Sequence, residues 1–476
     1  MIAGLADRLA SRVTPDGLVK LYRHAPERIT GAVVAHRFRE TVRFAARHSP
    51  FYRAAFAARG IVASRVRGPS DLGDFYTTPD DVVKDPEAFL CRPPAIVFES
   101  SGTSGKNKQV YYGRDELHAM GVVMAAGSRL MGIGAEDRVA NAFDFSIWIP
   151  GMLTHQSLLA SGNFCLAFGK VDPIEVYRRI EQYRFNVVMG EPTWLIRLTE
   201  LAEKHGSFPL KMLMGAAEEM PSQAIGWMEK VWQGAKVKMC YGSVELGSAL
   251  GFQPCDKISG YHVDATDFLP EIIEPDDDGY GELVFTTLRR RVMPLVRYRT
   301  RDVTRMSSGR CVCGLPGPTM EKLRGRRDEM VVASGGNLYP LMFENILSKI
   351  PAITPDWQVI FKLEGVREIM EMHVEAAGHA ADDRNDSACV NLTPDAQTQI
   401  REDIHAQATL QYPDFMKNLA LGIFGLRITL HPAGTLRTGR KLKRLVDKRH
   451  YDAPAAHSGN GVFSRQIPVI AGEIGA

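Results

Sequence analysis

The sequence predicts an α/β protein with a large N-terminal domain and a smaller α+β domain near its C-terminal end. A chain of 476 residues is too long for one ordinary hydrophobic core, so two folding units are expected. From Ala95 onward, short apolar runs alternate with longer stretches of helical periodicity, as in strands joined by helices. After Gly325 the pattern changes to a separate set of short elements. We therefore place the domains at residues 1–327 and 328–450, followed by a tail at 451–476.

The chain should open with helices and continue into an α/β sheet. Apolar residues recur at helical spacing from Gly31 to Gly60, and the pair Ser49-Pro50 is a natural break between two helices. Beyond this region each apolar run that predicts a strand precedes a helix or a glycine-rich turn. The expected strands are 95–98, 185–190 and 210–215, and the expected helices are 194–206 and 223–233.

Two strands should close the large domain before the small one begins. Residues 275–288 read as an acidic turn followed by a strand, and residues 293–306 read as a second strand. The small domain should then contain a turn and strand at 325–332, a helix from 341, strands near 357–361 and 371–374, and a helix at 395–409. The tail after Tyr451 is rich in Ala, Gly, Ser and Pro, and we expect it to be loosely ordered.

Composition narrows the possible functions. Formal net charge is +3 and the basic residues are scattered, which argues against a nucleic-acid surface. The sequence lacks the apolar run of about 20 residues that a bilayer span needs, and its first residues are charged too early for a secretory signal, so we expect a cytoplasmic protein. The seven cysteines are an odd number in a large chain, which argues against a disulfide framework.

A polar glycine-rich loop follows the first predicted strand. Backbone N–H groups and hydroxyls in such a loop can surround phosphate oxygens, with Lys106 or Lys108 adding positive charge. The spacing differs from that of a Walker loop, and a flexible connection is the simpler interpretation of this segment by itself. The residues of the candidate phosphate loop are Ser100, Ser101, Gly102, Thr103, Ser104, Gly105 and Lys106.

This loop resembles the phosphate-binding signature of the adenylate-forming, or AMP-binding, superfamily. Four further segments follow in the order that the superfamily shows. The resemblance implies a large N-terminal adenylate-forming domain, a small mobile C-terminal domain, and the use of ATP and Mg²⁺. It also implies that Gly215 and Ala216, after a predicted strand, lie at the adenine pocket, where α/β sheets bind ligands.

The second segment, Tyr241 to Glu245, resembles the family's Tyr-Gly-x-Thr-Glu motif. The resemblance implies that Tyr241, with Gly242 and Ser243, lies against adenine and that Glu245 binds Mg²⁺, a hard cation that prefers oxygen ligands. Val244 replaces the usual threonine, so one hydroxyl that could contact phosphate is missing. The alternative for Glu245 is a surface carboxylate.

The third and fourth segments concern ribose and the hinge. Residues 293–306 match the family's Tyr-Arg-Thr-x-Asp strand, and the carboxylate of Asp302 can accept both hydroxyls of a ribose. A surface ion pair is the alternative for Asp302. Residues 325–340 resemble the start of the mobile domain, which implies that Arg326 reaches the ribose and that Asp328 is the hinge.

The last segment, Gly434 to Asp447, resembles the family's lysine-bearing loop. In that family the ammonium group offsets negative charge that develops at the carboxylate and the α-phosphate. We choose Lys441 for this role. Arg440 stands where glycine usually precedes the lysine, so Lys443 is an alternative, and a plain basic surface is another.

Several details resemble the phenylacetate-CoA ligase branch of the superfamily. These are the segment at His48, the run at residues 297–302 and the Cys-Val-Cys-Gly segment before the hinge. The resemblance places His155 near the acyl pocket, and a packed core histidine is equally compatible with the sequence. The neighbouring loop differs from that of the branch, because it carries bulky residues such as Phe145 and Trp148. The acid substrate can therefore differ from phenylacetate.

The cysteines offer a possible zinc site. Cys311 and Cys313 form one pair, and Cys255 with His262 forms a second, which together would supply the four ligands of a structural site. The spacing differs from that of zinc fingers, and buried free thiols are the alternative. Zinc occurs in some phenylacetate-CoA ligase relatives at matching segments, so the resemblance implies bound Zn²⁺.

We therefore expect an ATP-dependent acid–CoA ligase acting on an aryl or arylacetic acid. The acid would form an acyl-adenylate with release of pyrophosphate, and CoA would then accept the acyl group. One alternative passes the adenylate to an amine or to the thiol of a carrier protein. A second alternative is a non-catalytic nucleotide-binding protein of the same fold. Besides the small carboxylic acid, ATP and CoA, a homodimer partner is a further expectation.

Overall fold

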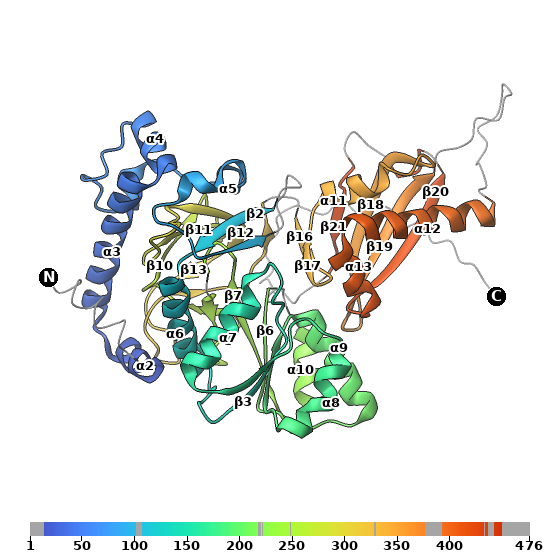
Figure 1. Ribbon diagram of the computed structural model, residues 1–476, viewed down its shortest axis with the longest axis horizontal. Coiled ribbons are helices and arrows are strands. Elements are labelled where there is room, and N and C mark those ends of the chain that lie inside the picture. The colour runs from blue at the N-terminus through green and yellow to red at the C-terminus, as the bar shows by residue number, and fades with distance from the viewer. Residues whose placement is uncertain are drawn as a thin grey trace.

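The computed structural model describes residues 14–100, 107–217, 220, 222–247, 249–327, 330–376, 393–432, 434–436 and 442–449. The chain forms a mixed α/β structure with a large N-terminal body and a smaller C-terminal body. In Figure 1 the N-terminal helices lie at one end of the molecule and the C-terminal elements, in orange and red, lie at the other. The expected α/β class and the two-part architecture are confirmed.

The N-terminal helices break where the sequence predicts. α3 (Glu27–His48) ends just before Ser49, and α4 (Pro50–Ala58) begins just after it. The Ser49 hydroxyl accepts a hydrogen bond from the Tyr52 amide at 3.3 Å, which caps α4, and proline suits the first helical position. The other early elements are α2 (Pro15–His24), η1 (Pro69–Leu72), α5 (Pro79–Lys84) and η2 (Pro86–Phe89).

The centre of the large body is a nine-stranded sheet in the order β13-β14-β9-β8-β7-β6-β5-β3-β4. Strands β4, β3, β5, β6 and β7 run parallel, and the strands from β7 to β13 pair antiparallel. The strands are β3 (Arg138–Asn141), β4 (Phe164–Ala167), β5 (Val187–Gly190), β6 (Met212–Ala216), β7 (Lys236–Gly242), β8 (Ala249–Phe252), β9 (Tyr261–Val263), β13 (Met306–Ser307) and β14 (Thr319–Met320).

Both faces of the central parallel strands β5 and β6 are largely buried. In β5, Val188 packs in the main apolar core, whereas Val187 and Met189 pack in a second cluster on the opposite face. Strands buried on both faces read as continuous apolar runs, which explains why the sequence revealed them. The covering helices are α6 (Arg114–Leu130), α7 (Ile149–Ser161), α8 (Pro173–Tyr183), α9 (Pro192–His205) and α10 (Ser222–Val231).

A hairpin and a smaller sheet complete the large body. The hairpin joins β1 (Ile96–Ser100) to β2 (Lys108–Tyr112), and the sheet has the order β10-β11-β12-β15. Its strands are β10 (Phe268–Ile273), β11 (Gly281–Thr287), β12 (Tyr298–Thr304) and β15 (Gly325–Arg326). In β12 buried and half-buried positions alternate, whereas β11 is buried along its whole length.

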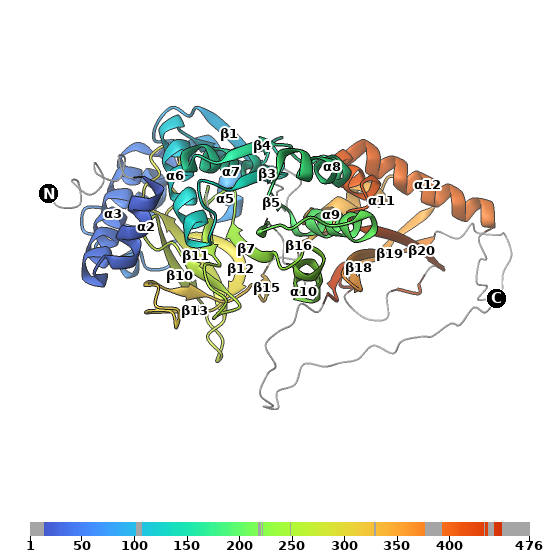
Figure 2. The ribbon, with the colours of Figure 1, turned by 90° about the horizontal axis from the view of Figure 1, so that it is seen from below.

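The C-terminal body packs helices against a four-stranded sheet in the order β20-β19-β18-β21. A two-stranded hairpin, β16 and β17, precedes it, and α9 of the large body contacts β19. Figures 1 and 2 both place α9 beside this body. The elements are β16 (Val331–Ala333), β17 (Gly336–Leu338), α11 (Pro340–Leu347), β18 (Ile353–Glu364), β19 (Arg367–Ala376), α12 (Pro394–Gln411), α13 (Pro413–Ala420), β20 (Gly425–Pro432) and β21 (Leu445–Asp447).

Candidate nucleotide site and metal centre

Asp302 is the centre of the first candidate site. Its carboxylate accepts a hydrogen bond from the Tyr241 hydroxyl at 2.5 Å and a second, charged one from Arg326. Strand pairing explains the meeting, because Asp302 on β12 lies opposite Arg326 on β15, while Tyr241 comes from β7. Burial, followed by the adjacent carboxylate, raises the pKa of Tyr241 well above its usual value, so the phenol stays a hydrogen-bond donor.

Glu245 forms a second charged group beside the first. Its carboxylate pairs with the ammonium group of Lys108 and accepts a hydrogen bond from the Tyr298 hydroxyl at 2.9 Å. Burial by itself would raise the pKa of Glu245, but Lys108, with hydrogen bonds to the carboxylate, lowers it to about 2. Glu245 is only 4% exposed, so it is a buried ionised carboxylate and not a surface one.

The two groups are joined through β12. Tyr298 and Asp302 both occupy buried positions of β12, and Tyr298 reaches Glu245 while Asp302 reaches Tyr241. Tyr298 is the tyrosine of the Tyr-Arg-Thr-x-Asp segment, but no role was predicted for it. The alternation of β12 in the sequence was the signal that could have identified it.

The segment after β7 turns sharply between the two groups. Gly242 ends the strand, and the Ser243 side chain accepts a hydrogen bond from the Leu246 amide at 3.3 Å. Val244, which stands where the family has threonine, is buried, and its carbonyl accepts a hydrogen bond from Tyr112. At this position an apolar side chain that packs in the protein interior therefore takes the place of the threonine hydroxyl.

The structure describes only part of the predicted phosphate loop. Ser100 ends β1 and lies opposite Lys108 across the hairpin, so the loop begins and ends next to the Glu245 group. The Ser100 hydroxyl is buried and has no hydrogen-bond partner among the described residues. Residues 101–106 lie outside the described part of the chain, as do Asp328 and Lys441.

The remaining predicted nucleotide residues lie at the ends of parallel strands. Gly215 and Ala216 end β6, beside Gly190 on β5 and Cys240 on β7. A side chain at Gly215 would meet the Met239 sulfur at 2.6 Å, so it would displace the Met239 side chain of the neighbouring strand. These residues occupy the carboxyl edge of the sheet, where ligands bind in α/β folds.

His155 belongs to a different neighbourhood on α7. Its Nδ1 lies 3.8 Å from the sulfur of Cys165, and its ring meets that of Phe145 edge-on at 6.0 Å between centroids. The ring is half-buried, which differs from a fully packed core histidine. Burial raises the pKa of Cys165, so this cysteine is a neutral thiol next to the imidazole.

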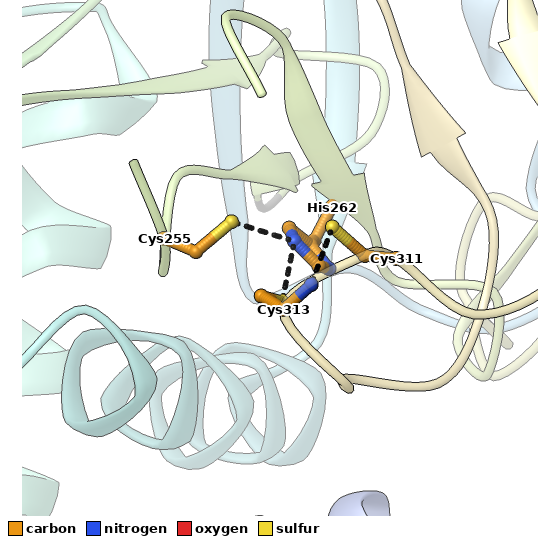
Figure 3. A group of neighbouring side chains, drawn as sticks. All are labelled: Cys255, His262, Cys311 and Cys313. Atoms are coloured by element: carbon orange, nitrogen blue, oxygen red, sulfur yellow. Dashed lines mark hydrogen bonds between the residues drawn. The ribbon is translucent and has the colours of Figure 1, made fainter. Parts of the chain in front are cut away.

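The two metal-ligand pairs come together although they are far apart in the sequence. His262 on β9 lies opposite Thr319 on β14, and β14 pairs with β13, which leads into the loop of Cys311 and Cys313. All four candidate ligand atoms lie within 4.8 Å of one another. Figure 3 shows Cys255, Cys311 and Cys313 gathered around the imidazole of His262.

The separations suit a tetrahedral zinc ion. The Nε2 atom of His262 lies 3.4 Å from the Cys255 sulfur and 3.6 Å from the Cys313 sulfur. Zn–S bonds of about 2.3 Å and Zn–N bonds of about 2.0 Å place tetrahedral ligands about 3.5–3.8 Å apart. Three sulfurs and one imidazole nitrogen are also the ligand types of structural zinc sites. The four residues therefore fit the ion.

Comparisons with known proteins agree with this geometry. The family model "AMP-binding enzyme" matches residues 60–267, and the model "AMP-binding enzyme C-terminal domain" matches residues 335–449. The chain belongs to the AMP-binding family of adenylate-forming enzymes. This AMP-binding enzyme has acid–CoA ligases among its relatives, as the predicted resemblance implied.

Two relatives illustrate the extent of the match. A phenylacetate-coenzyme A ligase from Thermus thermophilus is 27% identical over 435 residues, which cover 88% of this AMP-binding enzyme and 96% of the relative. A phenylacetate-coenzyme A ligase from Aromatoleum evansii is 27% identical over 442 residues, with 88% and 94% covered. The predicted branch of the family is confirmed by these relatives.

A solved structure reproduces the fold of the AMP-binding enzyme. The structure of 2-hydroxyisobutyryl-CoA ligase with 2-HIB-AMP and CoA, described as the thioesterification state, matches with a TM-score of 0.73 at 19% identity and covers 91% of this chain and 92% of its own. A structure of the same ligase in the postadenylation state gives a TM-score of 0.60, with 90% and 91% covered.

Among the described helices, none is both long and apolar enough to cross a bilayer.

Proposed function

We propose that this protein is an ATP-dependent carboxylic acid–CoA ligase that acts through an acyl-adenylate. The observation that carries the proposal is the buried Asp302 carboxylate, which two strands and a tyrosine fix at the carboxyl edge of the parallel sheet. A carboxylate can accept both hydroxyls of a ribose, and Arg326 beside it supplies a further donor. Tyr241, Gly215 and Ala216 would then border the adenine.

The reaction would proceed in two displacements. A carboxylate oxygen of the acid attacks the α-phosphorus of ATP, the bond to the bridging oxygen breaks, and pyrophosphate leaves. The CoA sulfur then attacks the acyl carbon, its proton passes to solvent, and AMP leaves with the electron pair of the acyl–oxygen bond. Neither step needs a covalent enzyme nucleophile, so positioning and electrostatic stabilisation carry the chemistry.

Glu245 is the residue that would hold Mg²⁺. Its low pKa keeps it ionised across the physiological range, and a buried ionised carboxylate suits a hard divalent cation. Magnesium would supply charge neutralisation at the phosphates. Lys108 occupies the same carboxylate, so it would have to share Glu245 with the cation or turn toward the phosphates held by residues 100–106.

The C-terminal residues complete the proposal. Lys441 would stabilise charge at the reacting carboxylate and α-phosphate, and Lys443 is the alternative. The hinge would lie at Asp328, between domains at residues 1–327 and 328–450. The better match to a thioesterification state supports an arrangement of the two bodies that suits the second displacement.

The proposed acid is an aryl or arylacetic acid. The phenylacetate-CoA ligases among the relatives support this class, and the edge-on contact of Phe145 with His155 supports an aromatic pocket near α7. Bulky Trp148 next to this region supports a change in preference relative to phenylacetate.

We also propose that Cys255, His262, Cys311 and Cys313 hold a structural zinc ion. Four protein ligands leave no open position for a catalytic water, so zinc would stabilise the fold there. The close grouping of the ligand atoms supports this role.

The deciding experiment measures AMP released from ATP and Mg²⁺ with a panel of aryl, arylacetic and aliphatic acids, each with and without CoA. AMP together with an acyl-CoA product identified by mass would establish the ligase and its substrate class. Adenylate without thioester would favour an amine or a carrier-protein thiol as acceptor. Failure of every acid, together with tight ATP binding, would favour a non-catalytic nucleotide-binding protein.

A further inference from the structure

Lys170 forms a polar contact between the two bodies. It lies in the loop between β4 and α8, and its ammonium group donates a hydrogen bond to the carbonyl oxygen of Gly335 at 3.2 Å. Gly335 is in the turn of the β16–β17 hairpin, which belongs to the C-terminal part of the chain. The Lys170 side chain is only 7% exposed, so its positive charge is almost removed from solvent.

The carboxylate of Glu191 balances the buried positive charge of Lys170. This carboxylate lies 2.5 Å from the Lys170 ammonium, and Glu191 follows β5, so both residues belong to the carboxyl edge of the same sheet. A buried ammonium without a partner would be strongly unfavourable. The ion pair stays within the large body if the bodies separate, whereas the bond to Gly335 depends on their orientation.

The hairpin turn is held rigidly on the other side of the contact. The Asn418 side chain on α13 donates to the carbonyls of Ser334 at 3.1 Å and Gly335 at 3.3 Å, and the Ser334 amide donates to Glu368 at 2.5 Å. These bonds fix the direction of the Gly335 carbonyl before Lys170 reaches it. The formation of the contact therefore depends on the orientation of the whole C-terminal body and not on that of a loose loop.

Glycine is required at position 335 for this approach. Its φ of +76° is a left-handed conformation, and a Cβ there would lie 2.8 Å from the Asn418 Nδ2 atom and 2.9 Å from the Lys170 Nζ atom. A side chain would therefore both strain the turn and push the ammonium group away.

We propose that Lys170 is an interdomain positioning residue that stabilises the arrangement used for thioester formation. The inference rests on the proposed ligase function, because it assigns the Lys170–Gly335 bond to one of two half-reactions. It goes beyond that function by naming the contact that selects the arrangement. Adenylation, in the other arrangement, does not need the bond, so loss of Lys170 acts on the second displacement alone.

The test compares the two half-reactions in Lys170→Met. Adenylation is followed by acid-dependent ATP–pyrophosphate exchange, and thioester formation by acyl-CoA produced from supplied acyl-adenylate and CoA. We expect thioester formation to fall about ten-fold, with exchange within about two-fold of the natural protein. Lys170→Arg, which keeps a charged donor, should restore part of the lost rate. Equal loss in both half-reactions would overturn the proposal.

Two further variants separate positioning from general damage. Lys211→Met removes an ion pair of 2.6 Å with the buried Asp137 in the same body, away from the hairpin. It should change both half-reactions by the same factor. Gly335→Ala should reproduce the selective loss from the other side of the contact, and its effect should not add to that of Lys170→Met. Full additivity would contradict a shared contact.

Amide hydrogen exchange needs no substrate, so it tests the Lys170–Gly335 contact without relying on the proposed ligase function. Amide hydrogen exchange in residues 331–338 should become faster in Lys170→Met and stay unchanged in Lys211→Met. Unchanged exchange in the hairpin of Lys170→Met would overturn the contact itself. An absence of ATP–pyrophosphate exchange in the natural protein would overturn the proposed function instead, so the two failures are distinguishable.

Discussion

Tyr241 donates a 2.5 Å hydrogen bond to the carboxylate of Asp302, and this bond joins two sheets. Tyr241 lies on β7 of the nine-stranded sheet, whereas Asp302 lies on β12 of the four-stranded sheet. Because the two residues come from different sheets, the shape of the proposed ribose site depends on how the sheets pack. Arg326, on the strand next to β12, fixes the second oxygen of the carboxylate.

Replacing Asp302 should weaken the use of ATP. Asp302→Ala removes both acceptors of the proposed ribose contact, and hydrogen bonds to a charged group contribute about 1.5–3 kcal/mol, so the KM for ATP should rise about 10- to 100-fold. Tyr241→Phe, which removes one hydroxyl and keeps the carboxylate, should have a smaller effect. The measurement is pyrophosphate exchange against ATP concentration. An unchanged apparent ATP affinity in Asp302→Ala would remove the assignment.

Replacing Lys108 should destabilise the protein most at neutral pH. The side chains of Lys108 and Glu245 are 12% and 5% exposed, and removing one partner of a buried pair costs about 3–5 kcal/mol. The pKa of Glu245 falls from 4.5 to about 2 in the folded protein, so the stabilisation is present above about pH 4.5 and is lost as pH falls toward 2. The stability gap between Lys108→Met and the natural protein should therefore narrow in acid.

Denaturant unfolding at neutral and acidic pH measures this gap. The matched control is Arg427→Met, which breaks an exposed pair with Glu364 whose side chains are 52% and 49% accessible. Its unfolding midpoint should barely move, because exposed pairs are well solvated. A gap for Lys108→Met that is constant with pH would show that the low pKa of Glu245 has another origin.

Zinc should be present at one ion per chain. Elemental analysis of freshly purified, unchelated protein is the measurement, and Cys311→Ser should lose the metal together with part of the thermal stability. Cys91→Ser is the control, since Cys91 lies outside the four-residue group. Protein that contains no zinc would rule out the metal site.

Lys441→Ala should strongly slow adenylation, whereas Lys443→Ala should leave its rate nearly unchanged. The ammonium group is expected to act on charge that develops at the α-phosphate, where removal of one stabilising donor lowers kcat about 100- to 1000-fold. The backbone carbonyl of Lys443 accepts a hydrogen bond from Gln358 at 2.8 Å, and Lys443→Ala keeps this bond. The rate of ATP–pyrophosphate exchange, measured in both variants, shows which lysine acts in adenylation. The reverse pattern would make Lys443 the functional lysine.

His155→Ala should change the preference among acids without changing the KM for ATP. Its contacts are with Phe145 and Cys165, in a different neighbourhood from the Asp302 group. Rates of AMP release with the acid panel measure the preference, and the KM for ATP in the same variant is the internal control. If both remain as in the natural protein, His155 is a packing residue only.

Local patterns predicted much of the fold. Ser49 and Pro50 revealed the boundary between α3 and α4, because a hydroxyl cap and a proline without a backbone donor act within one helical turn. The apolar runs that became β5 and β6 were equally visible, since both faces of these strands are buried. A turn and a strand were predicted at residues 275–288, and the packing of the smaller sheet buries every residue of the strand that forms there, β11.

The site was predictable as a set of residues and not as a set of contacts. The residue types could be read directly from the sequence: a carboxylate at Asp302, a second at Glu245, and the cysteines and histidine of the metal group. The contacts appeared only in the folded protein, where Lys108 pairs with Glu245, 137 residues later, and Lys170 reaches Gly335 over 165 residues. Periodicity is a local property set by backbone geometry, whereas these pairings depend on how separate sheets and bodies pack together.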